Sequence, residues 1–212
     1  MKQPYENIYL GNFIFALGFQ AAHTKKGLSD KCIQLVQQTP DDTKLSDLFV
    51  NWSGKSFILE FKRDQSKVGT ELEKEAKKKL NLLLNHPSNT YIREISNKSH
   101  FLGFGLENGL GFVRYSTINT DISSYISLGK FCEAIVGGNY DLGLNYQELK
   151  EYLAFIESAT ESTTSGCGGF ILNIADDGGL MMLPFDNIEL LSQELDIKPT
   201  PPTPAPTYRM GM

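Results

Sequence analysis

The hydrophobic pattern of the chain predicts helices and strands in alternation. A long apolar and aromatic run over residues 6–22 fits a helix by its length. Farther along, apolar residues at alternate positions predict a strand over 45–52, and a mostly apolar run predicts a second strand over 56–62 that is covered on both faces. The Ser53-Gly54 pair between them is typical of a hairpin turn, so we expect the two strands to pair in antiparallel fashion.

The remaining segments complete a mixed α/β pattern. Thr70 and Glu73 have the spacing of a capping box, which predicts the start of an amphipathic helix over 70–84. Other helices are expected over 29–38, 121–136, 145–159 and 186–195, and strands over 90–95, 100–106, 110–115, 170–175 and 180–183. The last residues, 198–212, are rich in Pro and Thr and are expected to be extended and flexible.

The composition is that of a soluble globular protein, but the charge is unevenly distributed. Apolar residues make up 41% of the chain, and no run reaches the ~18 apolar residues of a membrane span, so no membrane is expected as a partner. Residues 1–116 hold 16 Lys and Arg against 12 Asp and Glu, a net charge of +4, whereas residues 117–212 hold 4 against 13, a net charge of −9. A basic half can attract phosphates and an acidic half can meet a basic partner; alternatively, both are simply solvated.

The cysteines argue for a cytoplasmic protein without a structural metal cluster. Cys32, Cys132 and Cys167 are odd in number and far apart, and none of them has the spacing of a zinc site. We therefore expect reduced thiols rather than a disulfide framework.

One group of residues could carry out chemistry. Glu60 and Lys62 are two positions apart in a predicted strand and therefore point to the same face. A hairpin centred on 53–54 sets Asp47 across from about residue 60, so two carboxylates and a lysine converge. A hard divalent cation, Mg²⁺ (or Mn²⁺), would relieve the repulsion between the carboxylates and could activate a water, while Lys62 would stabilise negative charge on a phosphodiester. The alternative is a salt-bridged pair on a half-exposed strand.

The same residues carry a resemblance to a known family. The order helix, strand with Asp47, turn, strand with Glu60-Phe61-Lys62, helix, strand resembles the PD-(D/E)xK nuclease superfamily over roughly residues 5–115. The resemblance implies an α/β, restriction-endonuclease-like core over residues 1–116, with a central mixed β-sheet flanked by helices. It also implies that an acid on the first helix joins the metal site, and Glu6 is the acid available there.

The expected function is therefore metal-dependent hydrolysis of nucleic acid, DNA rather than RNA, by Asp47, Glu60 and Lys62. Arg63, Gln65 and Lys67 follow the site and could contact the substrate, although loop polarity explains them equally well. A role in phage defence or DNA processing is what the resemblance implies. Residues 117–197 are expected to form an acidic α+β extension packed on the core, which could mediate homo-oligomer or partner binding. The alternative function is a catalytically inactive, nuclease-fold subunit that acts as a protein-interaction module.

Overall fold

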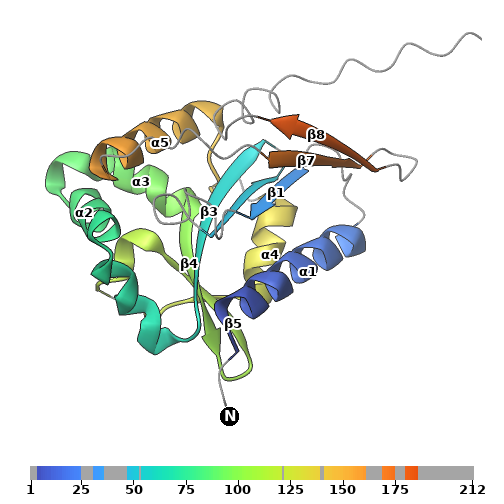
Figure 1. Cartoon of the computed structure of the whole chain (residues 1–212), viewed down its shortest axis with the longest axis horizontal. Helices are drawn as coiled ribbons and strands as arrows, with labels where there is room; N and C mark the ends of the chain where they lie inside the picture. The colour runs from blue at the N-terminus through green and yellow to red at the C-terminus, as the bar shows by residue number, and fades with distance from the viewer. Residues whose placement is uncertain are drawn as a thin grey trace, which may run out of the picture.

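The computed structural model describes residues 4–24, 31–35, 47–52, 54–120, 122–138, 141–160, 169–174 and 180–185, with 31–35, 169–174 and 180–185 described as backbone. The described part is an α/β structure with a central mixed sheet flanked by helices (Figure 1). This agrees with the coarse fold class expected from the sequence. The predicted helix over 186–195 and the tail 198–212 lie outside the described residues.

Six strands form the central sheet in the order of the chain. They are β1 (Lys31–Leu35), β2 (Leu48–Trp52), β3 (Lys55–Lys62), β4 (His100–Leu106), β5 (Gly109–Arg114) and the two-residue β6 (Ile126–Ser127). The β3–β4 pair is parallel and the other pairs are antiparallel. Strands β7 (Gly169–Ile174) and β8 (Leu180–Phe185) form a separate hairpin whose β7 contacts β1.

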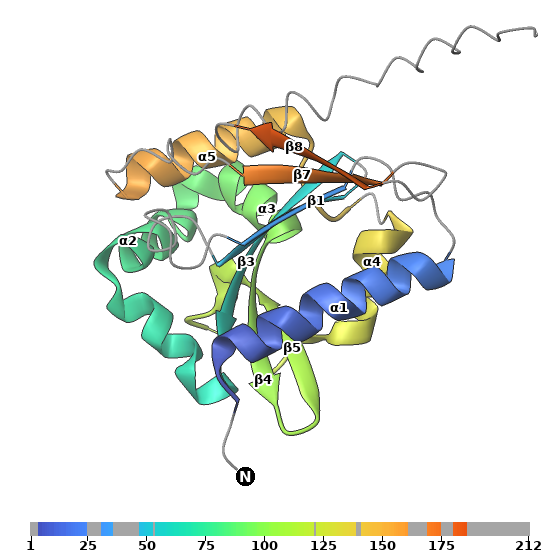
Figure 2. The same ribbon diagram turned by 45° about the vertical axis from the view of Figure 1, so that its right-hand side comes forward.

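Helices cover both faces of this sheet (Figures 1 and 2). Helices α1 (Glu6–Thr24) and α4 (Leu128–Gly137) pack on one face, against the odd-numbered β3 residues Phe57, Leu59 and Phe61. On the other face, Ile58 of β3 belongs to the core formed with α2 (Glu75–Leu84), α3 (Thr90–Ser99) and α5 (Tyr146–Thr160). Because β3 is buried on both faces, its even-numbered polar residues must lie inside the protein.

The helix after β3 differs from its prediction in a way that shapes the site. Residues Gln65–Glu73 form the 3₁₀ helix η1, Lys74 is extended, and α2 begins only at Glu75. The predicted capping box is wrong: the Thr70 hydroxyl donates instead to the carbonyl of Lys67. The break at Lys74 allows Glu71 to turn inward, where it is fully buried.

Two further secondary-structure predictions are wrong. The segment predicted as a helix over 29–38 contains strand β1, which pairs with β2; a short apolar run fits either element, and pairing with an open sheet edge decides between them. The segment predicted as a strand over 90–95 is helix α3, which follows the short 3₁₀ turn η2 (Pro87–Asn89). Its buried residues Ile95, Ser96 and Ser99 have helical spacing, which the β-branched residues of the segment obscured.

The other predictions in the described part hold. The hairpin of β4 and β5, helix α5 and the β7–β8 pair match the predicted 100–115, 145–159 and 170–183 segments. Helix α4 starts later than the predicted 121–136 helix, after the turn η3 (Tyr115–Thr117) and β6. Among the helices described, none is long and apolar enough to span a membrane.

Candidate functional site

Asp47 is fixed to strand β3 at two points. Its backbone N–H donates to the carbonyl of Leu59 (3.1 Å), and its Oδ2 accepts from the backbone N–H of Phe61 (2.7 Å). The register of β2 and β3 pairs Leu48 with Leu59, so Asp47 stands across from Glu60. The register predicted from the turn at residues 53–54 is thus confirmed.

Glu60 and Lys62 project from β3 toward η1 and α2, where each meets a residue of opposite charge. The Lys77 ammonium of α2 donates to Glu60 Oε1, and Lys62 Nζ lies 2.8 Å from Glu71 Oε2. Glu71 also lies 3.8 Å from Lys77. Glu60, Glu71 and Lys77 are fully buried and Lys62 is 7% exposed. We call these four residues the ionic cluster.

Sequence reasoning missed Glu71 and Lys77. Both lie in a segment dense in Glu and Lys, which is typical of a solvated helix with i,i+4 pairs. A signal was nevertheless present, because Lys77 falls three and seven positions before Leu80 and Leu84, on the buried stripe of α2. A lysine on an apolar stripe indicates a buried partner of opposite charge.

The environment of the site shifts the pKa values of its ionisable residues in different directions. Burial raises the pKa of Glu60 to about 8, against the attraction of Lys77, and burial likewise raises the pKa of Asp47. Burial disfavours the charge of Lys62, but the adjacent carboxylate of Glu71 outweighs it and raises the Lys62 pKa. For Glu71, burial is outweighed by Lys77 and Lys62 together, so its pKa is lowered. The pair Lys62–Glu71 is therefore charged, while burial disfavours the charged forms of Glu60 and Asp47.

The remaining predicted site residues have different surroundings. Glu6, half-buried at the start of α1, is near enough that its charge contributes to raising the pKa of Lys62. The Arg63 guanidinium lies over the Tyr5 ring, 5.0 Å from its centroid, and Gln65 donates to the carbonyl of Ile122 (3.1 Å). Lys67 is exposed on η1.

The carboxylates of Asp47, just before β2, and Glu60 of β3 are the groups that could hold a divalent cation. Glu60 Oε2 is buried and has no hydrogen-bond partner in the structure, and a carboxylate oxygen left in that state gains from a cation. Within the residue ranges described above, no three acidic, His or Cys side chains come together as a metal centre. A two-carboxylate site still suits Mg²⁺, which commonly takes one or two carboxylates and keeps several waters.

Behind the ionic cluster lies a buried aromatic and polar network. The Lys77 ammonium lies 5.9 Å from the ring centroid of Tyr115, which stacks on His100 at 4.0 Å. His100 Nδ1 and the hydroxyl of Tyr152 are 2.7 Å apart, and that hydroxyl is 2.9 Å from Ser96 Oγ. Burial, with the charge of Lys77 as a second cause, lowers the pKa of His100 well below its ordinary value of 6.5.

We expect His100 to make the fold acid-sensitive. Because the folded state excludes its proton, the unfolded chain binds more protons below pH 6.5, and stability should fall as the pH drops through that value. The slope contributed by one such group is about 1.4 kcal/mol per pH unit. Glu60 and Asp47, whose pKa values are raised, contribute a slope of opposite sign, so the His100 contribution is the difference between two chains. In urea denaturation between pH 7 and 5, stability should fall by about this much more per pH unit in the native chain than in His100→Gln. Equal slopes would contradict the prediction; His86→Gln, at an exposed histidine, serves as the control.

Comparison with models of protein families, with curated proteins and with solved structures finds no match. Any assignment of function therefore depends on the geometry of the site.

Proposed function

We propose that this protein is a metal-dependent nuclease with a restriction-endonuclease-like core of the PD-(D/E)xK type. One observation carries the proposal: Asp47 and Glu60 face each other on paired strands, and Lys62 follows on the same side of β3. Charged residues are costly inside a strand that is buried on both faces, so their presence calls for a reason beyond folding.

Asp47 and Glu60 would hold Mg²⁺ or Mn²⁺, and the unpartnered Glu60 Oε2 favours this. When bound, the cation would neutralise phosphodiester charge and lower the pKa of a coordinated water. Lys62 would position the attacking water and stabilise negative charge developing on the phosphate. Glu71, 2.8 Å from Lys62, would keep that ammonium charged and oriented. Glu6 at the start of α1 would add a further negative charge near the cation.

The surroundings of the cluster suit a phosphate backbone. Lys67 is exposed on η1, and the Lys74 side chain is 46% exposed at the rim, 3.7 Å from Glu71. Lysines at such positions neutralise phosphates without reading sequence. Together with Arg63 and Gln65 they would form the approach for nucleic acid, for which we propose DNA.

A cleavage assay tests the proposal. Purified protein is incubated with supercoiled plasmid, single-stranded DNA and RNA in Mg²⁺ or Mn²⁺, beside Lys62→Ala and a chelator control. We expect metal-dependent cleavage by the native chain and a loss of at least about 100-fold in Lys62→Ala. Equal, background-level cleavage by both proteins on all three substrates would refute a nuclease function.

A second candidate, a non-catalytic interaction module on the same fold, is favoured by a different observation. Lys77 already contacts Glu60, and Lys62 pairs with Glu71, so the cluster is compensated without a cation. In this case the net −9 of residues 117–212 would meet a basic protein surface. Isothermal titration of the protein with Mn²⁺ separates the two functions. A nuclease should give a heat of Mn²⁺ binding that is absent in Glu60→Gln, whereas an interaction module requires no such heat.

A further inference from the structure

The outer face of helix α1 is apolar, uncharged and exposed. Phe15 is 75% exposed, Phe19 64% and Ile8 50%. No residue between Asn7 and Ala22 is Asp, Glu, Lys, Arg or His. The exposed residues of this helix that share one face are Ile8, Gly11, Asn12, Phe15, Gly18, Phe19 and Ala22, which we call the α1 outer face. Such a concentration of exposed aromatic residues is unusual on a monomer and marks an interaction surface.

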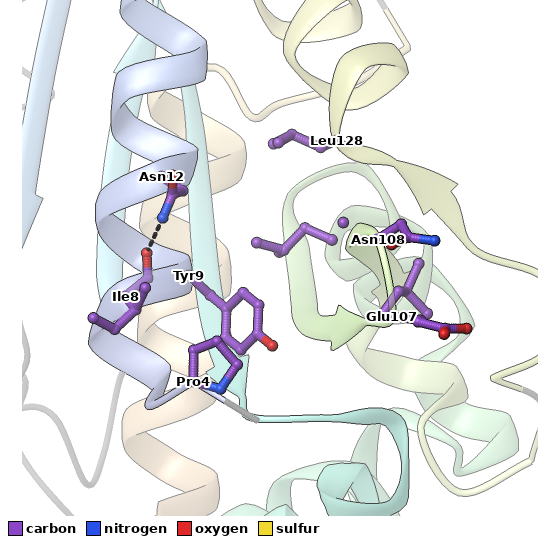
Figure 3. A pocket seen from close by; sticks show the side chains of 10 residues that line it. Pro4, Ile8, Tyr9, Asn12, Glu107, Asn108 and Leu128 are labelled. Carbon is purple, nitrogen blue, oxygen red and sulfur yellow. Dashed lines mark hydrogen bonds between the residues drawn. The ribbon is translucent and has the colours of Figure 1, made fainter. Parts of the chain in front are cut away.

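A pocket adjoins this face at the N-terminal half of the helix (Figure 3). It has a volume of about 630 Å³ and lies between α1, the β4–β5 hairpin tip and the start of α4. Ile8 and Asn12 of the α1 outer face contribute to its wall, opposite Leu110 and Leu128. Glu107 stands at the hairpin tip and is exposed.

We infer that the α1 outer face binds a second copy of this chain, with the two α1 helices antiparallel about a two-fold axis at Phe15. The face is self-complementary in this arrangement. Phe15 meets its symmetry mate, Phe19 faces the open space beside Gly11, and Ile8 faces Ala22. A side chain built on Gly11 or Gly18 would meet nothing within 4 Å, so both glycines leave room for a partner's aromatic ring. An isologous contact requires this kind of self-match.

Charge supports the same partner and orientation. The uncharged faces approach without repulsion, and antiparallel helix dipoles attract each other. The antiparallel register brings His23, in the last turn of α1, toward the partner's pocket, whose rim carries Glu107. His23 of α1 thus faces the acidic Glu107 across this contact. Phe19, one turn before His23, would enter that pocket beside Asn12 of the partner.

The dimer leaves uncovered the side of the sheet that holds the ionic cluster, and it does not depend on the proposed nuclease function. The cluster faces η1 and α2, whereas α1 covers the opposite face of the sheet. A single helix pair with two filled pockets, one on each copy, buries less than the roughly 1,200 Å² of a standard interface, so we expect dissociation in the micromolar range.

Sedimentation velocity over about 0.5–200 µM tests the inference. The native chain should shift from monomer to dimer, and Phe15→Glu and Phe19→Glu should each weaken the dimer at least about 30-fold, since they bury a charge at the contact. Leu82→Glu, which changes a leucine 62% exposed on α2, is the matched control and should leave the equilibrium unchanged. Circular dichroism confirms that each variant is folded.

A charge exchange tests the orientation. His23→Glu places two carboxylates together and should weaken the dimer about fivefold, while adding Glu107→Lys should restore it. A native chain that stays monomeric at 200 µM would overturn the inference. If that monomer also binds anionic lipid vesicles, the α1 outer face is assigned to a membrane instead. A dimer that is unaffected by Phe15→Glu would also overturn it.

Discussion

Lys77→Met is expected to lower the free energy of unfolding by about 3–5 kcal/mol, measured by urea denaturation at pH 7. Lys77 is fully buried, contacts Glu60 and lies 3.8 Å from Glu71. Methionine retains most of the side-chain volume but leaves the charged Glu71 without one of its two buried counter-ions and Glu60 Oε1 without its hydrogen-bond donor. Removing one member of a buried ion pair costs this much because the other charges remain in a poorly solvated place.

Two further variants isolate the cause of this loss. Lys78→Met changes the neighbouring, exposed lysine of α2 and should alter stability by no more than about 0.5 kcal/mol. Glu60→Gln combined with Lys77→Met should lose less than the sum of the two single changes, since Glu60 and Lys77 contact each other and both single changes disturb that one contact. A loss below about 1 kcal/mol for Lys77→Met would show that the ionic cluster contributes little to stability.

The strands that hold the candidate site could be predicted from sequence because local signals agree there. A turn signal at Ser53-Gly54 fixes the register of the hairpin, and the register alone places Asp47 across from Glu60. The two-residue period of a strand then puts Lys62 on the same side as Glu60. No tertiary information is needed for these three positions.

Glu71 and Lys77 could not be placed in the same way. Their positions depend on the break at Lys74, where the chain is extended between η1 and α2, and no glycine or proline marks that break. The break lets Glu71 contact Lys62 of β3 and Lys77 of α2, which belong to other elements, so no local propensity within η1 predicts it. Likewise, β1 becomes a strand through pairing with β2, although its apolar run fits a short helix equally well.

The ionic cluster and Asp47 would together meet two requirements of the proposed metal site. The negative charge of Asp47 and Glu60 must be compensated while no cation is bound, and Lys77 does this for Glu60. The raised pKa of Glu60 has the same effect, since protonation removes its buried charge, and burial raises the pKa of Asp47 in the same direction. A cation that replaces the proton and the Lys77 contact would then bind at groups already held in position by the strand register.

Asp47→Asn is expected to reduce metal-dependent cleavage by about 10³-fold while leaving the fold intact. The amide oxygen of asparagine can still accept from the N–H of Phe61, so the contact that fixes residue 47 to β3 survives. The change removes one negative charge from the proposed metal site. A 10³-fold slower reaction corresponds to a loss of about 4 kcal/mol in transition-state stabilisation. Because burial already disfavours the Asp47 charge, stability should stay the same or rise.

Asp64→Asn is the matched control for this change. Asp64 follows β3 and accepts from the backbone N–H of Ser66 at the start of η1, and asparagine caps a helix equally well. Cleavage by Asp64→Asn should therefore remain within about twofold of the native chain, and Mn²⁺ titration should show binding by Asp64→Asn but not by Asp47→Asn. Full cleavage and full metal binding by Asp47→Asn would remove this carboxylate from the site and leave Glu60 without the second ligand that the proposed chemistry requires.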